Sequence, residues 1–398
     1  SDELVLEIAQ SRHDRARREL AQNGYPVTVY EALPIAGGMM VVGIPEYRLP
    51  RDILNQEIDN IRRAGVEILC NRALGRDFTL DELFDRQGVK AVVLAIGAHR
   101  SLHLGIPGED RAGVIPGIDF LREVALGNPP DIRGKRVAVI GGGNVAVDAA
   151  RTAWRLGAAE VHIVYRRTRA DMPAYPEEIE AAHEEGAVFH FLAAPVRVLG
   201  PATVTALEIQ HQKLTEFDAS GRRRPVPVEG AVSTLAIDIL IPAIGQETDK
   251  LCVLNAGLET NRNSTLKVGP SLATTRERVF AAGDAVSGPA SVIEAVAHGN
   301  RVAKEVEVYL RTGRREKVDI PLEAHLPPLT WDMEQYSEAL RLRQPWIPVA
   351  ARQGSFREVE LSAPEKEIRA ECRRCLRCDL EWGQFQQGVQ NARVQGVT

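Results

Sequence analysis

Short apolar runs, each followed by a glycine, divide much of the chain into strand-like and helix-like segments. Residues 137–140 are apolar without alternation, which is typical of a parallel strand buried on both faces, and residues 161–165 indicate a second strand. Between these runs, apolar side chains recur at helical spacing, at Val147, Ala150, Ala153 and Trp154. The pattern therefore predicts a strand, a tight turn, a helix and a second strand.

The turn after the first of these strands carries the pattern G-x-G-x-x-A. Gly141 permits the tight turn, Gly143 lets a pyrophosphate approach the backbone, and Ala146 permits close packing of helix on strand. The unpaired N–H groups and the positive dipole end of the helix favour bound phosphate. Because the pattern stands between a predicted strand and a predicted helix, it indicates a dinucleotide-binding site rather than a glycine turn without a ligand.

The residues at the end of the second strand bear on which nicotinamide dinucleotide binds. An NAD site commonly has Asp or Glu here, bound to the ribose hydroxyl. This chain has Arg166 and Arg167 after Tyr165, and Arg169 follows. Guanidinium groups bind a 2′-phosphate bidentately and stay charged. The sequence favours NADP, and a solvated basic surface is the alternative that leaves NAD open.

A second unit of the same kind is predicted near the amino terminus, without its glycine turn. Residues 27–30 indicate the second strand of this unit, and Glu31 follows them as an acid placed for a ribose. The segment where the turn belongs contains no glycine before Gly24. Bulky side chains in such a turn would keep a pyrophosphate away from the backbone.

Further apolar segments complete the two units. Residues 91–97 and 237–245 are strand-like and end in glycine, so each indicates the return strand of one unit. Another apolar strand closes at Gly283 and Asp284, and a helix is predicted to begin near Ser291.

Composition limits the classes of function. The chain has 398 residues, with 49 Lys plus Arg against 54 Asp plus Glu and a formal net charge of −5. A nucleic-acid-binding surface needs a net basic field, so this balance argues against a nucleic-acid partner. No apolar run reaches the roughly 18 residues of a membrane span, and no signal-peptide pattern is present. We therefore expect two or three domains, no membrane span and a cytoplasmic protein.

The five cysteines occupy two kinds of position. Cys70 and Cys252 stand alone in apolar sequence and are interpreted as small buried hydrophobic residues. The other three, Cys372, Cys375 and Cys378, have the spacing C-x-x-C-x-x-C, which lets thiolates converge on an iron–sulfur cluster. A fourth ligand is absent from the remaining tail. A metal-free docking tail therefore stays open beside a cluster completed by another cysteine or by a partner subunit.

The other titratable residues form no catalytic pattern. The nine histidines have no ligand spacing, and no Ser-His-Asp set indicates hydrolysis. His99 and His298 are interpreted as ordinary polar residues. Glu177 and Glu178 are interpreted as charges at a helix amino terminus.

Several motifs resemble one family of flavoproteins. They are V-T-V-Y-E-A, A-G-G-M-M-V-V-G-I-P-E-Y-R-L-P, G-G-G-N-V-A-V-D, V-Y-R-R-T-R-A-D-M-P and V-F-A-A-G-D. In this order, over about residues 15–310, they resemble the glutamate synthase small-subunit family, whose module also occurs in dihydropyrimidine dehydrogenase and in NADP-linked ferredoxin oxidoreductases. The resemblance implies an α/β fold with two Rossmann-like dinucleotide-binding domains, the NAD(P) domain being inserted in the FAD domain.

The same resemblance implies a division into domains. The FAD-binding domain would comprise residues 1–115 and 246–312, and the NAD(P)-binding domain residues 116–245. Residues 313–398 would form a C-terminal extension with the cysteine motif. From about residue 313 prolines increase and periodicity fades, which is typical of an extension over a core.

The resemblance also implies which residues bind FAD. Glu31 would bind the adenosine ribose, Leu74 would lie near the adenine, and Asp284 would accept hydrogen bonds from the ribityl or pyrophosphate region. The helix that begins at Ser291 and Val292 would point its positive end at the flavin N1–O2 edge, which becomes negative on reduction. The residues expected to approach the flavin are Gly38, Met39 and Arg48, and the strand-end glycines of the site are Gly97 and Gly283.

On the nicotinamide side the resemblance implies a phosphate loop of Gly141, Gly142, Gly143, Asn144 and Val145. Arg166 and Arg167 would bind the 2′-phosphate. The nicotinamide approach would be lined by Ala243, Ile244 and Gly245. No catalytic acid or base is expected, because the protein holds two rings stacked and tunes the flavin.

The chain departs from the family pattern in two respects. Glycines of the FAD phosphate loop would align near Ile8, Gln10 and His13, and none of these is glycine. A local shift of reading frame is one hypothesis, because codons for S-R-H-D-R-A-R-R at 11–18 can read P-G-T-T-G-L-A-A in a shifted frame. Second, we find neither an iron–sulfur region ahead of the FAD domain nor a redox C-x-x-C in the NAD(P) domain. An electron acceptor on another subunit is therefore expected.

These features together predict an FAD-containing NAD(P) oxidoreductase subunit. It would pass electrons between NAD(P)(H) and the iron–sulfur clusters of a partner, in a hetero-oligomer that also has a catalytic subunit. The complex would be glutamate synthase-like, or a molybdenum- or tungsten-containing aldehyde or formate oxidoreductase. Two alternatives stay open: a nucleotide-sensing or structural subunit that has lost FAD binding, and a free-standing diaphorase.

Overall fold

The structure, a computed structural model, describes residues 4–8, 24–217, 222–315 and 342–372. The chain divides into two compact units. The first unit comprises Ser1–Val318 and Val349–Glu358, and the second comprises Asp319–Pro348 and Val359–Thr398.

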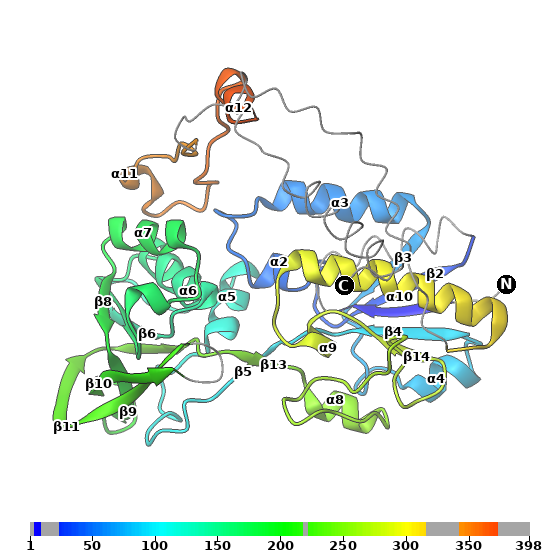
Figure 1. The fold of residues 1–398 in the computed structure, drawn as a ribbon, viewed down its shortest axis with the longest axis horizontal. Coiled ribbons are helices and arrows are strands. Elements are labelled where there is room, and N and C mark those ends of the chain that lie inside the picture. Colours follow the sequence, from blue (N-terminus) through cyan, green and yellow to red (C-terminus); the bar gives the residue numbers. More distant parts are fainter. Residues whose placement is uncertain (1–3, 9–23, 218–221, 316–341, 373–398) are drawn as a thin grey trace, which may run out of the picture. The chain divides into compact units, whose positions relative to one another are not determined.

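The first unit contains a five-stranded parallel sheet in the order β14-β4-β1-β2-β3 (Figure 1). The strands are β1 (Leu4–Ile8), β2 (Val27–Glu31), β3 (Val66–Cys70), β4 (Ala91–Ala95) and β14 (Val279–Ala281). All neighbours pair parallel. β2 and β4 are buried over their whole length, which explains why β4 is an unbroken apolar run; β2 also buries the polar Thr28 and Glu31.

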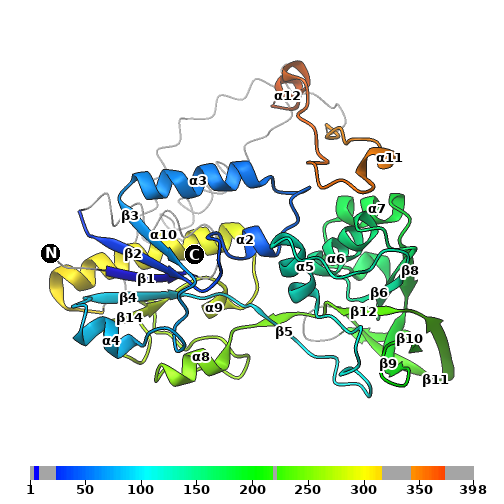
Figure 2. The same ribbon diagram turned by 180° about the vertical axis from the view of Figure 1, so that it is seen from behind.

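Helices cover both faces of this first sheet (Figure 2). They are α3 (Arg51–Arg63), α4 (Leu80–Asp85), α8 (Lys250–Asn255) and α10 (Val292–Thr312). Because side chains alternate along a strand, Ala91, Val93 and Ala95 of β4 pack toward α3 and α10. Val92 and Leu94 pack on the opposite face, toward α4 and α8.

A second parallel sheet, in the order β12-β6-β7-β8, is inserted between β4 and β14 of the first. Its strands are β6 (Arg136–Ile140), β7 (Glu160–Tyr165), β8 (Val188–Phe191) and β12 (Ile239–Pro242). All neighbours again pair parallel. The strands predicted at 137–140 and 161–165 are confirmed, and so is the α/β fold with one unit inserted in another.

The two faces of the second sheet are covered by different structures. Three helices pack on one face: α5 (Gly117–Ala125), α6 (Asn144–Arg155) and α7 (Pro176–Glu184). An antiparallel sheet packs on the other face, formed by β9 (Ala193–Leu199), β10 (Ala206–Phe217) and β11 (Arg223–Ala236). The sequence analysis did not predict this antiparallel sheet.

Two short strands connect the sheets. β5 (Arg100–Ser101) leads out of the first sheet and β13 (Gln246–Glu247) leads back, and the two pair antiparallel. Three shorter helices lie at strand ends or loops: α2 (Met39–Val42), α9 (Asp284–Ser287) and the 3₁₀ turn η1 (Arg169–Asp171).

The helix predicted to begin near Ser291 is confirmed as α10. The Ser291 hydroxyl accepts from the Glu294 amide, and the Glu294 carboxylate accepts from the Ser291 amide at 2.8 Å. This capping box satisfies donors at the amino end of the helix. Gly313 ends the helix in a left-handed conformation, with φ 69°.

The region predicted as a C-terminal extension is described in part. The short helix α11 (Val349–Arg352) belongs to the first unit. In the second unit an antiparallel bridge joins Trp346 to Glu360, and α12 (Glu365–Cys372) follows. Over the residues that the structure describes, no helix is both long and apolar enough to cross a membrane.

Candidate functional site

The glycine turn after β6 has two glycines that the fold requires and one that faces open space. Gly141 has φ 144°, and a Cβ there would overlap the Ala243 carbonyl oxygen. A Cβ on Gly142 would lie 2.6 Å from the Tyr165 ring. A Cβ on Gly143 would meet nothing closer than 3.9 Å. The backbone at Gly143 is therefore open to a bulky ligand.

The amino end of α6 follows this turn directly, and no side chain caps it. The first N–H groups and the positive dipole end of this 12-residue helix thus face the turn. The Asn144 amide oxygen accepts from the Tyr175 amide at 3.2 Å, and the Gly142 carbonyl accepts from Ala174 at 3.1 Å. Val145 packs against the core. The turn is fixed in place and fits the phosphates of a dinucleotide.

The two arginines after β7 have different environments. Arg166 is exposed, whereas Arg167 is only 5% exposed. The Arg167 Nε donates to the Arg223 carbonyl at 2.9 Å, at the start of β11. Of the two guanidinium groups expected at a 2′-phosphate, the structure presents that of Arg166 to solvent and turns that of Arg167 toward β11.

The predicted nicotinamide approach lies at the same edge of the second sheet. The Ala243 amide donates to the Ile140 carbonyl at 2.8 Å, so Ala243 extends the pairing of β12 with β6 beside the glycine turn. Ile244 is 43% exposed, and Gly245 follows with φ 140°. The structure therefore brings Ala243 next to Gly141, with an exposed apolar side chain after it.

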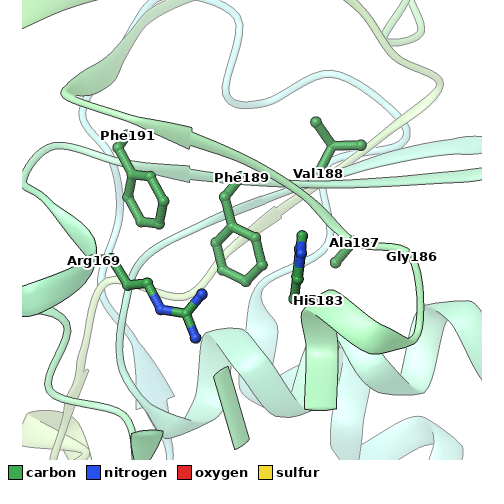
Figure 3. A pocket seen from close by; sticks show the side chains of 7 residues that line it. All are labelled: Arg169, His183, Gly186, Ala187, Val188, Phe189 and Phe191. Atoms are coloured by element: carbon green, nitrogen blue, oxygen red, sulfur yellow. The ribbon is translucent and has the colours of Figure 1, made fainter. Parts of the chain in front are cut away.

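Two depressions lie at the outer edge of the second sheet. The larger, of about 460 Å³, is lined by Arg169, His183, Gly186, Ala187, Val188, Phe189 and Phe191 (Figure 3). The other, of about 410 Å³, is lined by Arg169, Ala170, Met172, Ala174, Pro176 and Ile179. Arg169 lines both, and it also forms an ion pair with Glu180. Neither depression includes a residue of the glycine turn, although Ala174 is bonded to it.

At the first sheet, Glu31 occupies the place that Tyr165 and Arg166 have at the second. It ends β2 and is 1% exposed. Its Oε1 accepts from the Leu33 amide at 2.9 Å, and its carbonyl oxygen accepts from Arg72 at 2.9 Å. Leu74 is 6% exposed nearby in sequence. Burial, and then the negative charge of Glu31, raise the pKa of the Cys70 thiol.

The return strands of the first sheet end in left-handed glycines. Gly97 has φ 61° and Gly283 has φ 69°. The Gly283 amide donates to His298 Nδ1 at 3.2 Å, so this histidine supports the loop, which its interpretation as an ordinary polar residue missed. Asp284 begins α9, and burial raises the pKa of its carboxyl to about 6.

The amino end of α10 lies beside the segment expected near the flavin. Val292 packs against the apolar cluster of α2, which contains Met39 and Met40. Gly38 is the residue before α2 and has φ 52°. The capping box places the Glu294 carboxylate at the same helix end, where its charge offsets part of the positive dipole.

Arg48, expected to approach the flavin, binds two carboxylates on helices of the second sheet. Its Nη1 lies 2.8 Å and 3.0 Å from the two Asp148 carboxylate oxygens, and its Nε lies 3.1 Å from Glu178. Tyr47 is fully buried, and its hydroxyl donates to the Asp148 carbonyl at 3.4 Å. Burial raises the pKa of Asp148 to about 6, although Arg48 acts in the opposite direction.

Further buried ion pairs lie next to Glu178, one of the two carboxylates that Arg48 binds. Arg151 of α6 pairs with Glu178 and, at 2.8 Å, with Glu185. Arg155 pairs with Glu185 at 2.8 Å, and its guanidinium lies 3.8 Å from the Tyr47 ring centroid. Arg352 of α11 lies 3.4 Å from Glu185. Glu178 stands in the first turn of α7, as predicted, but it is buried and paired rather than a solvated charge.

The cysteines and the expected FAD loop fall partly outside the described residues. Cys372 is exposed at the end of α12, whereas Cys375 and Cys378 lie outside them. Cys70 and Cys252, interpreted as small buried hydrophobic residues, are half-buried, and Cys252 packs against the core of the first sheet. In the described part of the chain, no His, Cys, Asp and Glu side chains form a group that could hold a metal ion. Ile8 ends β1, and the loop positions Gln10 and His13 lie outside.

Comparison with known proteins agrees with this geometry. Residues 15–299 match the family described as pyridine nucleotide-disulphide oxidoreductase. The chain is 46% identical over 373 residues to the NADP(+)-dependent formate dehydrogenase subunit beta of Moorella thermoacetica, covering 91% of this chain and 52% of the relative. It is 33% identical over 322 residues to the glutamate synthase [NADPH] small chain of Azospirillum brasilense, covering 77% and 66%. The first of these relatives is thus about twice as long as the stretch it shares.

The fold also resembles a solved structure. Mycobacterium tuberculosis FprA in complex with NADPH superposes with a TM-score of 0.66 at 19% identity, covering 78% of this chain and 85% of that one. At this identity the likeness concerns the fold alone.

Proposed function

Because the chain belongs to the pyridine nucleotide-disulphide oxidoreductase family, we propose that it is an FAD-containing subunit that carries electrons between NADP(H) and a partner subunit. The observation that carries the proposal is the edge of the second sheet. There an uncapped helix end, an open backbone at Gly143 and the exposed Arg166 lie together after parallel strands. This combination suits a dinucleotide with a 2′-phosphate.

We assign the NADP(H) site to the domain of residues 116–245. The first turn of α6 would bind the pyrophosphate through the amides that follow Gly143. Arg166 would bind the 2′-phosphate, and Arg167 would support β11 through its bond to Arg223. Ile244 would exclude water from one face of the nicotinamide, because its side chain is apolar and exposed.

We assign FAD to the domain formed by residues 1–115 and 246–312. Glu31 would bind the ribose, since a buried acid at the end of the second strand accepts from hydroxyl groups. The left-handed Gly97 and Gly283 would let the cofactor approach the strand ends. Gly38, Met39 and Val292 would surround the flavin. Bound FAD supplies hydride exchange with nicotinamide and electron transfer to one-electron acceptors.

For the partner, we propose an iron–sulfur subunit of a formate dehydrogenase-like complex. The Moorella relative is named as a subunit of an NADP(+)-dependent formate dehydrogenase, and the Azospirillum relative as a glutamate synthase chain. The first shares 91% of this chain and the second 77%, which favours the formate dehydrogenase type. Such a complex would be cytoplasmic, as NADP-linked metabolism is.

The cysteine motif keeps two hypotheses within this proposal. Cys372, Cys375 and Cys378 would hold a cluster that a further ligand completes, or would belong to a metal-free docking tail. Iron and acid-labile sulfide, measured in the protein purified without oxygen, separate the two. A cluster predicts iron that is lost when Cys375 is replaced by Ser, whereas a docking tail predicts no iron in either protein.

One observation favours a second candidate, a nucleotide-binding subunit without FAD. Residues 9–23 contain no glycine, so the turn after β1 lacks the residue type that the FAD pyrophosphate needs. An intact mass equal to that of the sequence as written would remove the reading-frame hypothesis. Absence of flavin after reconstitution would then favour this second candidate.

The proposed function is tested by electron output. The chain reconstituted with FAD should reduce the one-electron acceptor ferricyanide, two per NADPH oxidised, and at least about tenfold more slowly with NADH at equal concentration. A partner iron–sulfur subunit should co-purify with it from cells that make the whole complex. Bound flavin without ferricyanide reduction by either nucleotide would contradict the proposal.

A further inference from the structure

The buried ion pairs of Arg48 join two segments that, under the proposed function, lie beside different cofactors. We propose that Arg48 is a positioning residue for hydride transfer. Through Asp148 and Glu178 it fixes the helix that carries the NADP phosphate loop against the segment beside the flavin. The inference rests on the proposed function, and it gives Arg48 a role other than the flavin contact that the family likeness implies, transmitted through Asp148 and Glu178.

On the nucleotide side, Asp148 stands on α6 itself. It lies four residues after Asn144, about one turn along the same helix face. Asn144 is in turn held to the loop at Tyr175, and α7 provides the second partner, Glu178. Because a helix moves as a rigid element, a shift at Asp148 displaces the uncapped amino end of α6 by a similar amount.

On the flavin side, Arg48 projects from a segment that is braced by its own bonds. The Arg48 and Leu49 amides both donate to the Pro45 carbonyl, at 3.0 Å and 3.1 Å. The Arg51 guanidinium donates to the carbonyls of Ile44, at 2.7 Å, and of Leu49, at 3.0 Å. This segment follows α2 without interruption, so Arg48 is fixed relative to Gly38 and Met39.

The ion pairs of Arg48 are largely buried, which keeps their geometry well defined. The side chains of Asp148 and Glu178 are 4% and 6% exposed, and that of Arg48 is 19% exposed. Buried ion pairs add little net stability compared with apolar packing, but a guanidinium that donates to two carboxylates through two of its nitrogens holds a defined geometry. Arg151 pairs with Glu178 from within the second sheet's helices, and Arg48 is the cation that reaches both Asp148 and Glu178 from the flavin segment.

The same geometry argues against a direct role of the Arg48 guanidinium on the flavin ring. Its Nη1 and its Nε are both bound to carboxylates of the second sheet. An effect of Arg48 on hydride transfer should therefore be transmitted through Asp148. Asp148 contacts the flavin segment through Arg48 and Tyr47. Replacing Asp148 should therefore slow hydride transfer as replacing Arg48 does.

The test compares Arg48→Gln, Asp148→Ala and a matched control, Asp238→Ala, in the FAD-reconstituted full chain. Asp238 likewise pairs with an arginine, Arg136, at 2.8 Å and 3.0 Å, but both residues belong to the domain of the second sheet. The measurements are the rate constant of flavin reduction at saturating NADPH, counted per bound flavin, and the NADPH dissociation constant. Counting per bound flavin separates positioning from loss of folded protein.

A second readout does not depend on activity. Spin labels carried by non-canonical amino acids at Glu57 on α3 and Val232 on β11, both exposed, report the distance between the two sheets. We expect one narrow distance distribution in the wild type and in Asp238→Ala. We expect a broader distribution in Arg48→Gln and Asp148→Ala.

The proposal predicts that Arg48→Gln and Asp148→Ala each slow flavin reduction about 100-fold, because a misplacement of about 1 Å has this effect on an oriented reaction. The NADPH dissociation constant should change less than about threefold, since the phosphate loop keeps its amides. Asp238→Ala should stay within about twofold of the wild type. If Arg48→Gln does not fold, Asp148→Ala carries the test alone, because Arg48 then retains Glu178 as a partner.

Three results overturn the proposal. They are rates within about twofold of the wild type in both variants, a slow Arg48→Gln beside an unchanged Asp148→Ala, and unchanged label distances in both. The second result would assign Arg48 to direct contact with the flavin. If NADPH does not reduce the flavin bound to the wild-type protein, the proposed function is contradicted instead. The distances between the spin labels would still decide whether the ion pairs fix the two sheets relative to each other.

Discussion

Four strands of the first sheet, β4-β1-β2-β3, have the order of the second sheet, β12-β6-β7-β8, but the charges at the ends of β2 and β7 are opposite. β2 ends in Glu31, a buried carboxylate, whereas β7 ends in Tyr165 and is followed by the exposed Arg166. In a Rossmann unit this position faces the adenosine ribose. The shared topology therefore fixes where a nucleotide would bind, and the charge at one position determines which nucleotide suits each sheet.

The segments that follow β1 in the first sheet and β6 in the second sheet differ in sequence as well. After β6, Gly141 and Gly142 are required because any side chain there would meet backbone or a ring. After β1, which ends at Ile8, the sequence has no glycine until Gly24. The second sheet thus has the complete set of features for a phosphate, and the first sheet depends on Glu31 and the strand-end glycines.

The largest expected effect concerns Gly143, the glycine after β6 at which a Cβ would meet open space. Gly143→Val should weaken NADPH binding on the order of 100-fold, about 2.7 kcal/mol, because the new side chain would occupy the space that the pyrophosphate needs. The melting temperature should stay within a few degrees of the wild type, since a Cβ there meets nothing closer than 3.9 Å and φ is −89°. Titration calorimetry and thermal unfolding measure the two.

Gly142→Val is the control for that variant. Its side chain would overlap the Tyr165 ring, so folding itself should be impaired. Equal loss of stability in both variants would contradict the distinction between a glycine required by the fold and a glycine required by the ligand.

The charge comparison at β7 gives the next effect. Arg166→Gln should lower kcat/KM for NADPH about 10- to 100-fold and leave that for NADH nearly unchanged, because a charge-assisted contact to the 2′-phosphate contributes about 1.5–3 kcal/mol. Arg167→Gln should lower the melting temperature without changing the ratio between the nucleotides, since Arg167 is buried and bonded to Arg223. If only Arg167→Gln changed the ratio of kcat/KM for NADPH to that for NADH, Arg167 and not Arg166 would be the residue that binds the 2′-phosphate.

A smaller effect is expected at the first sheet. Glu31→Gln should weaken FAD retention about tenfold, because the amide lacks the charge that strengthens hydrogen bonds from ribose hydroxyls. Glu67→Gln, an exposed residue on β3, is the matched control. Flavin retained after gel filtration measures the difference, and equal retention by both variants would show that Glu31 does not bind the cofactor.

The smallest effect is a dependence of stability on pH. Burial raises the pKa of Asp284 to about 6 from its ordinary value of 3.8, so the folded protein favours the neutral carboxyl. The stability that the neutral Asp284 carboxyl gives the folded protein is fully present below about pH 4 and is lost as the pH rises through 6. In the flavin-free protein, Asp284→Asn should therefore raise the free energy of unfolding at pH 7.5 and not at pH 4. Denaturant titrations at the two pH values measure it, and an equal change at both would contradict the assignment.

Local sequence patterns predicted the elements that local forces determine. Unbroken apolar runs predicted β6 and β4, and the glycine pattern predicted the turn before α6, because burial on both faces and positive φ angles leave a direct signature. The start of α10 at Ser291 was predictable for the same reason, since a capping serine acts on its own helix.

Contacts between distant residues were not predictable from such patterns. Arg48 and Asp148 are 100 residues apart, so nothing near either one indicates that they form an ion pair. Glu178 carries the pattern of a solvated helix end, yet the fold buries it against Arg151. Arg167 turns away from the ligand side because β11 offers a carbonyl, and β11 comes more than 50 residues later.

The central claim is that one sheet holds FAD and the other NADP(H), close enough for hydride exchange. The visible absorption spectrum of the purified chain during an anaerobic titration with NADPH, repeated with NADH, tests it most directly. The account predicts a yellow flavin band that bleaches with one equivalent of NADPH and far less readily with NADH. A protein that stays colourless after FAD is supplied would contradict it.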